Sequence, residues 1–246
     1  MDRIVPAMAL VAVALLGGCV TIQEERITNM GPPTGFINKT MTVGGKQLAY
    51  NVYVPRQYDP SRKWPLIVFL HGRGERGSDG LLQTDVGIGR AIRKNPERFP
   101  CLVAMPQCPA DSGWNARHDI IDETIARGFA EYSIDKSRVC LTGLSMGGYG
   151  TWSYGAAHPE LFAALLPICG GGMTTDAPAL AKVPIRVFHG GSDSIVNPTA
   201  SRAMVDAVKK AGGDIEYTEY PEVDHNSWDK TYGDETVIEW ILERKR

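Results

Sequence analysis

The chain has 246 residues, of which 43% are hydrophobic and 22% are charged. This composition is ordinary for a globular protein, and the length suits one domain with a full hydrophobic core. The formal net charge of -2 at pH 7 argues against nucleic acid and acidic lipid surfaces as general partners, because neither would attract the chain.

The N-terminal residues have the features of an export signal. Arg3 is followed by an apolar stretch over residues 4–16, and then by Leu16-Gly17-Gly18-Cys19. About a dozen apolar residues is too short to span a bilayer and fits the hydrophobic region of a signal peptide. The stretch resembles a bacterial lipoprotein signal, in which Leu-x-Gly-Cys marks cleavage before a cysteine that is then diacylated. The alternatives are a plain N-terminal anchor and a signal that is cleaved elsewhere.

We therefore expect a lipoprotein signal peptide over residues 1–18, with Cys19 as the lipidated residue. Residues 19–35 are polar and contain Gly31-Pro32-Pro33, which predicts a tether to a catalytic domain over residues 36–246. An aspartate after the lipidated cysteine would indicate inner-membrane retention, and Val20 stands there instead. The expected location is the cell envelope, at the outer membrane or the periplasmic face, with membrane contact only through the lipid.

Strand and helix patterns alternate along the remaining chain. Residues 48–54 alternate at period two after Gly44-Gly45, as in the second arm of a hairpin, and residues 215–220 alternate again. Continuous apolar runs that suit strands buried on both faces lie at 64–70, 101–105, 138–142, 162–168 and 185–189. Helical stretches are expected near 85–94, 117–132, 146–158, 199–211 and 234–246.

This order predicts an α/β fold with a mostly parallel, eight-stranded sheet and helices on both faces, because crossovers between parallel strands are right-handed. Active sites of such sheets lie at the carboxyl ends of the strands. We expect no large cap domain, because residues 169–184 are too few to form one. We also expect no disulfide among Cys101, Cys108, Cys140 and Cys169.

A nucleophile is predicted directly after the strand at 138–142. Gly143-Leu144-Ser145-Met146-Gly147 fits Gly-x-Ser-x-Gly, the sharp strand-to-helix turn that exposes a serine hydroxyl above a sheet. The motif alone is weak evidence, but an apolar strand precedes it and a helix rich in small residues follows it. The alternative is a glycine-rich turn with an incidental serine.

The base and the acid follow from chain order. A serine needs a base within hydrogen-bond reach, and in this arrangement an acid and then a histidine follow the serine. His225, just past the last strand, is the only histidine that fits, since His189 precedes every acid in its loop and is expected to be a core residue at a strand end. Asp193 follows the strand at 185–189 and would orient the base. Asp224 ranks below it, because neighbouring side chains in an extended loop point apart.

An oxyanion hole needs backbone donors beside the serine. One is the N–H of Met146, and the other is expected in the glycine-rich loop at 71–77, where we choose Arg73 with Gly74 next. The side chains of Arg73, Glu75 and Arg76 could instead pair with one another. A phosphate-binding loop is disfavoured, because no Gly-Lys-Ser/Thr opens a helix here.

Five motifs together resemble the "predicted peptidase" branch of bacterial α/β-hydrolase esterases, which is related to phospholipase/carboxylesterases, dienelactone hydrolases and feruloyl esterases. They are the segments at 71–77, 105–109, 143–148, 189–193 and 224–228. The resemblance runs from about Lys46 to the C-terminus. It implies the same catalytic residues, Ser145, Asp193 and His225, and activity on short-chain or aryl esters.

The leading hypothesis is a serine carboxylesterase that acts on small esters, or on acyl and feruloyl groups of a polysaccharide. A serine peptidase or polyester depolymerase is the alternative, and a non-catalytic binding lipoprotein ranks last. Trp114 and Trp228 are expected to line the site, where their rings would stack on an aryl or sugar ring. No metal or other cofactor is expected, because no His/Cys/carboxylate cluster appears at ligand spacing and the chemistry needs none.

Overall fold

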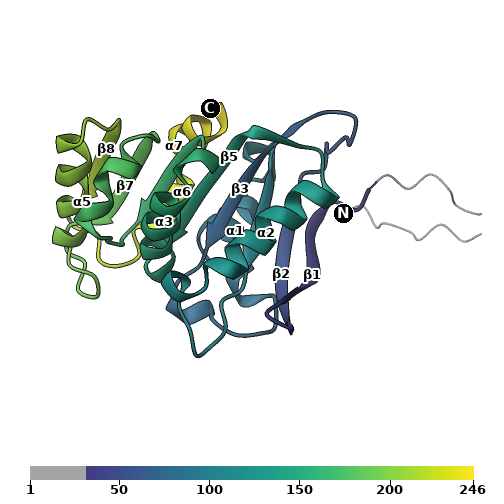
Figure 1. The fold of residues 1–246 in the computed structure, drawn as a ribbon. Helices are drawn as coiled ribbons and strands as arrows, with labels where there is room; N and C mark the ends of the chain where they lie inside the picture. Colours follow the sequence, from purple (N-terminus) through teal and green to yellow (C-terminus); the bar gives the residue numbers. More distant parts are fainter. Residues whose placement is uncertain (1–31) are drawn as a thin grey trace, which may run out of the picture. The chain divides into compact units, whose positions relative to one another are not determined.

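The computed structural model describes residues 32–246, so the expected signal peptide, Cys19 and most of the tether lie outside the described residues. Eight strands form one sheet in the order β1-β2-β4-β3-β5-β6-β7-β8 (Figure 1). The strands are β1 (Gly35–Val43), β2 (Lys46–Val54), β3 (Trp64–Leu70), β4 (Leu102–Pro106), β5 (Ile134–Leu144), β6 (Ala164–Ile168), β7 (Ile185–Gly190) and β8 (Ile215–Tyr220).

The first two strands are antiparallel, and β2 also pairs antiparallel with β4. All the other neighbouring pairs are parallel. The β1–β2 turn uses Gly44 and Gly45, whose φ angles of 56° and 78° suit glycine. The predicted eight-stranded, mostly parallel sheet is therefore confirmed.

Helices cover both faces of the sheet. They are α1 (Gly87–Lys94), α2 (His118–Glu131), α3 (Met146–Ala157), α4 (Ala177–Leu180), α5 (Thr199–Lys210), α6 (Trp228–Gly233) and α7 (Glu235–Glu243). The five longer helices start and end close to their predicted positions. The two short ones, α4 and α6, were not predicted, because each is too short to show an apolar period.

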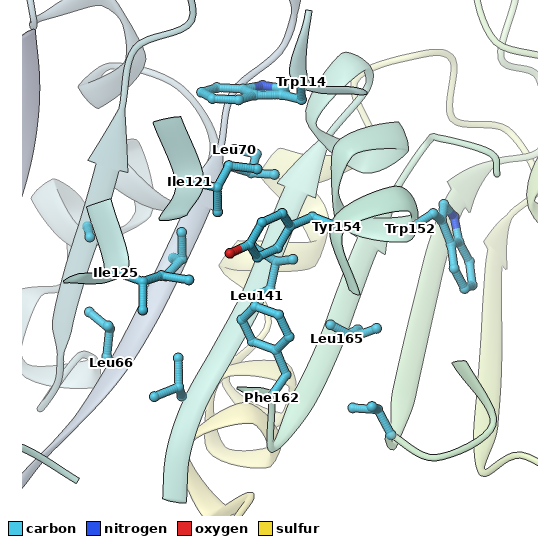
Figure 2. Close-up of a cluster of buried hydrophobic side chains, with 14 of the residues drawn as sticks. Leu66, Leu70, Trp114, Ile121, Ile125, Leu141, Trp152, Tyr154, Phe162 and Leu165 are labelled. Atoms are coloured by element: carbon cyan, nitrogen blue, oxygen red, sulfur yellow. The ribbon is translucent and has the colours of Figure 1, made fainter. Parts of the chain in front are cut away.

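Alternate residues of the central strands point into two separate cores. Leu66, Val68 and Leu70 of β3 join a cluster with α2, α3 and α5, whereas Ile67 and Phe69 join a cluster with α1, α6 and α7. Figure 2 shows part of the first cluster, where strand leucines meet the aromatic side chains of α3. Burial on both faces explains why these strands are continuous apolar runs.

The carboxyl edge of the sheet carries no large insertion. Residues 169–184, which connect β6 to β7, contain only a 3-10 turn and the short helix α4. None of the helices within residues 32–246 combines the length and the apolarity needed to cross a bilayer. Cys101, Cys108, Cys140 and Cys169 are free, buried thiols.

Candidate active site

Ser145 lies at the turn between β5 and α3, in a backbone conformation that few non-glycine residues adopt. Its φ is 53° and its ψ is -117°. The turn is tight because a Cβ on Gly147 would lie 1.8 Å from the carbonyl oxygen of Leu70, and one on Gly143 would lie 2.3 Å from that of Gly147. Both glycines of the motif are therefore required sterically, and the turn projects the serine at the carboxyl edge of the sheet.

The structure brings Ser145, His225 and Asp193 together from three separate loops. His225, in the loop after β8, places Nε2 at 2.9 Å from the Oγ of Ser145. Its Nδ1 lies 2.8 Å from Oδ2 of Asp193, which follows β7. The side chain of His225 is 18% exposed and that of Asp193 is 0% exposed. The serine and imidazole thus open to solvent, while the carboxylate lies behind them.

Asp193 is held by backbone groups as well as by His225. Its Oδ1 accepts the N–H groups of Ile195 at 2.9 Å and Val196 at 2.8 Å. Burial alone would raise the pKa of the Asp193 carboxyl, but these bonds and the one from His225 more than offset it and lower the pKa. The carboxylate is therefore ionised at neutral pH and fixed in orientation.

His189, expected to be only a core residue, is a second imidazole on Asp193. Its Nε2 lies 2.9 Å from the carbonyl oxygen of Val196 and 3.2 Å from Oδ2 of Asp193. Since both neighbours are acceptors, Nε2 carries the proton. Burial lowers the pKa of His189, and its Nδ1 lies 2.8 Å from the hydroxyl of Ser201, which itself donates to the carbonyl of Gly170. The only signal in the sequence was the four-residue spacing between His189 and Asp193.

Asp224 does not compete for the imidazole of His225. Its Oδ1 accepts the backbone N–H groups of Ser194 and His225, each at 2.8 Å, and it also accepts the Ser194 hydroxyl. The pKa of Asp224 is lowered chiefly by the hydrogen bonds from Ser194. Asp224 thus links the loop that carries His225 to the loop that carries Asp193.

The glycine-rich loop lies directly beside the serine. A Cβ on Gly72, the residue before Arg73, would lie 3.7 Å from the Cβ of Ser145. Met146 is the first residue of α3, and the N–H groups of a first helical turn have no partner within the helix. The segment that carries the expected donor Arg73 therefore lies beside Ser145, and the other expected donor, Met146, follows Ser145 directly.

A buried histidine anchors this loop. His71 donates Nδ1–H to the carbonyl of Gly72 at 2.6 Å and accepts the N–H of Cys108 at Nε2 at 2.9 Å. Burial lowers the pKa of His71 to about 4, which keeps the ring neutral. The alternative pairing of Glu75 with the arginines of the loop is not formed, because Arg76 donates to backbone carbonyls and Oε2 of Glu75 has no hydrogen-bond partner among the described residues.

The two tryptophans differ in position. Trp228 is half-buried and stands edge-on to His225, with ring centroids 5.3 Å apart, so it flanks the base. Trp114 is 0% exposed, and its Nε1 donates to the carbonyl of His71 at 2.9 Å. The expectation that Trp114 lines the site is therefore wrong: α3 covers its ring, and it supports the glycine-rich loop from beneath.

A third side chain, which the sequence did not place at the site, lies beside two of the predicted catalytic residues. Ligand atoms of Cys169, Asp193 and His225 lie within 4.8 Å of one another. Because each of the three residues comes from a different loop, their spacing along the chain does not predict that they lie together.

Two family models match the chain, each over about half of it. Residues 110–234 match the dienelactone hydrolase family, and residues 42–171 match the family described as "Putative esterase". The first match contains all three residues of the serine–imidazole–carboxylate arrangement, and the second contains Ser145 and the glycine-rich loop.

Two curated relatives are similar over more than half of the chain. "Probable feruloyl esterase C" of Aspergillus terreus is 24% identical, over 66% of this chain and 60% of the relative. "Poly(3-hydroxyalkanoate) depolymerase C" of Paucimonas lemoignei is 29% identical, over 58% of this chain and 44% of the relative. The chain thus spans less than two thirds of the length of either relative.

Solved structures show the same fold. A thermostable esterase superposes with a TM-score of 0.78 at 37% identity, covering 86% of this chain and 63% of the other. A feruloyl esterase module from Clostridium thermocellum, complexed with sinapinate, superposes with a TM-score of 0.69 at 18% identity, covering 88% and 91%. Together with the open eight-stranded sheet, these findings establish that the chain has the α/β-hydrolase fold and belongs to the dienelactone hydrolase family and to the family described as "Putative esterase".

Proposed function

We propose that the chain is a serine carboxylesterase that hydrolyses short-chain or aryl esters through an acyl-enzyme. The observation that carries the proposal is the continuous hydrogen-bonded series from the Ser145 hydroxyl through His225 to the buried Asp193. This arrangement supplies a nucleophile, a base and an orienting acid in one place.

In the proposed reaction, His225 Nε2 takes the proton of Ser145 as Oγ attacks the ester carbonyl. Asp193 holds the Nδ1–H tautomer and stabilises the imidazolium that forms. The N–H groups of Arg73 and Met146 donate to the developing oxyanion. The imidazolium then protonates the leaving alcohol, and water, activated by the same base, releases the acid from Ser145.

The proposed substrate is a soluble aryl or short-chain ester, or an acyl or feruloyl group attached to polysaccharide. Its support is the open edge of the sheet, the Trp228 ring beside the base, and the similarity to a feruloyl esterase. Binding of an acyl group that hangs from a polymer requires such an uncovered site.

A polyester depolymerase is the second candidate. Two of the exposed large apolar side chains lie on loops of the catalytic edge, Met173 at 67% exposure after β6 and Ile195 at 71% exposure after β7. An apolar rim suits an apolar polymer, and a poly(3-hydroxyalkanoate) depolymerase is among the relatives. Peptidase activity has no such support in the described residues.

A substrate panel tests these proposals. Purified protein is assayed for release of ferulate and acetate from xylan, of 3-hydroxybutyrate from a polyester film, and of amine from a peptide substrate. We expect ester release and labelling by a fluorophosphonate probe, and neither with Ser145→Ala. Peptide cleavage faster than ester cleavage, or labelling that persists in Ser145→Ala, would contradict the proposed function.

We also propose export and attachment to the cell envelope through a lipid on Cys19, the signal sequence being its support. The test is mass spectrometry of the N-terminal peptide together with detergent phase partition. Cys19→Ala should move the protein to the aqueous phase. Equal partition of both proteins would refute the lipid anchor.

A further inference from the structure

Cys169 is a buried thiol that the proposed reaction does not use. It directly follows β6, and its φ of 40° makes it, with Ser145, one of two non-glycine residues with positive φ in residues 32–246. Two backbone hydrogen bonds hold it there: its own N–H to Phe188 at 2.8 Å, and that of Ser145 to Ile168 at 3.0 Å. The fold thus fixes a strained cysteine beneath the nucleophile.

The thiol faces two residues of the catalytic arrangement. Ligand atoms of Cys169, Asp193 and His225 lie within 4.8 Å of one another. Thiolate, imidazole and carboxylate are the ligands that Zn²⁺ prefers, at about 2.0–2.3 Å, so the donors around one ion lie about 4 Å apart or less. To bind one ion, the longer separations would need to shorten by less than about 1 Å, and the 2.8 Å between Nδ1 of His225 and Oδ2 of Asp193 would need to lengthen slightly.

The groups around these ligands suit a bound cation. Ser227 is 0% exposed, and its hydroxyl lies beside the thiol of Cys169 and has no other hydrogen-bond partner among the described residues. It could donate to a metal-bound thiolate. The Asp193 carboxylate already accepts hydrogen bonds from two backbone N–H groups and lies beside His189. Outer partners of this kind orient the ligands of metal sites.

We propose that Cys169, Asp193 and His225 form an inhibitory site for a thiophilic divalent cation such as Zn²⁺ or Cd²⁺. On binding, the S–H bond of Cys169 breaks, its proton leaves to water, and a metal–thiolate bond forms. Asp193 contributes a carboxylate lone pair, and His225 contributes the lone pair of Nδ1, whose proton is released to solvent while Nε2 takes one up, so that nothing is oxidised or reduced. Water completes the coordination on the side that opens to solvent.

Bound metal removes the base, because a metal on Nδ1 of His225 leaves the proton on Nε2, which then has no lone pair to accept the proton of Ser145. This loss of activity rests on the proposed function, whereas binding itself does not. The site is therefore expected to act as a reversible inhibitor site that a chelator clears.

The test uses Cd²⁺ as the probe, because a cadmium–thiolate bond gives an ultraviolet charge-transfer band. The full chain is titrated with Cd²⁺ while the band and ester hydrolysis are followed. We expect one equivalent to produce the band, a loss of activity of at least about tenfold, and recovery with EDTA. Ser227→Ala should weaken Cd²⁺ binding by about tenfold.

Matched variants assign the site. Cys169→Gly suits the positive φ, and Cys169→Ser keeps a small polar group; each is compared with its own metal-free rate. Both should lack the band and retain their rate at a Cd²⁺ concentration that inhibits the parent, whereas Cys101→Ala, another buried thiol, should behave as the parent. A band and inhibition that persist in both Cys169 variants would overturn the proposal, as would a parent without the band.

Ser145→Ala separates the two proposals. It should bind Cd²⁺ with the same band although it cannot hydrolyse esters. If it still hydrolyses esters, the proposed function fails while the band continues to report on the cation site. If the parent binds Cd²⁺ at Cys169 and keeps its activity, the inhibitory role is refuted.

Discussion

Replacing His189 by leucine removes the side-chain hydrogen bond that reaches Asp193 from behind. The lost contact joins an N–H to an ionised carboxylate at 3.2 Å, with both side chains 0% exposed. A hydrogen bond to a charged group contributes about 1.5–3 kcal/mol, which corresponds to a fall in kcat of about tenfold to a hundredfold if it serves to orient the acid. The fall should stay below the roughly ten-thousandfold that follows loss of the acid's function in a triad.

The assay is steady-state hydrolysis of a soluble aryl ester by His189→Leu and His189→Gln. Glutamine offers an N–H near the position of Nε2, so it should restore most of kcat, whereas KM should stay unchanged in both because His189 lies behind the carboxylate. The downfield ¹H resonance of the His225 Nδ1 proton should lose intensity only in the leucine variant. Equal kcat values for the two variants at equal thermal stability would refute the reasoning.

Three further predictions concern stability and binding. The pKa of His71 is about 4 in the folded protein and 6.5 in the unfolded chain. As the pH falls from about 6.5 to 4, the unfolded chain takes up the proton first, and about 3 kcal/mol of stability is lost. Urea unfolding of the parent protein should show this loss, and the His71→Asn variant should lack it. Gly147→Ala should prevent folding or lower the free energy of unfolding by more than about 4 kcal/mol. Gly74 has open space around it, so Gly74→Ala should change the free energy of unfolding by less than about 0.5 kcal/mol. Equal thermal melts of the two variants, followed by circular dichroism, would contradict this prediction. Trp114→Ala should lower the free energy of unfolding by about 3–5 kcal/mol, measured by calorimetry. Trp228→Ala should instead raise KM for aryl esters by about threefold to tenfold. An unchanged KM would refute contact between Trp228 and the substrate.

The sheet was predictable because burial on both faces leaves continuous apolar runs. The runs at 64–70 and 185–189 coincide with β3 and β7 to within one residue, and the alternating segment at 215–220 coincides with β8. β5 is longer than expected, since it begins at Ile134 and continues through the polar residues 135–137, which lie near the edge of the core and show no apolar pattern.

The three central side chains of the site could also be placed from the sequence, because strand order brings their loops to one edge. The rest depends on how helices dock. Trp114 is buried because Gly150 of α3 lets the helix lie against it: a Cβ there would be 2.5 Å from the Cβ of Trp114. The proximity of Cys169 to His225 arises only from convergence in three dimensions, and residue type does not reveal that the ring of His189 turns toward Asp193.

The short connection between β6 and β7 bears on turnover. In many hydrolases, a flap must swing aside before product escapes, and that movement limits the rate. The connection at 169–184 offers only the small helix α4 for such a flap. Water and the alcohol product can therefore enter and leave the site without a movement of that segment. We expect the rate-limiting step of each cycle to be the making or breaking of a bond at Ser145.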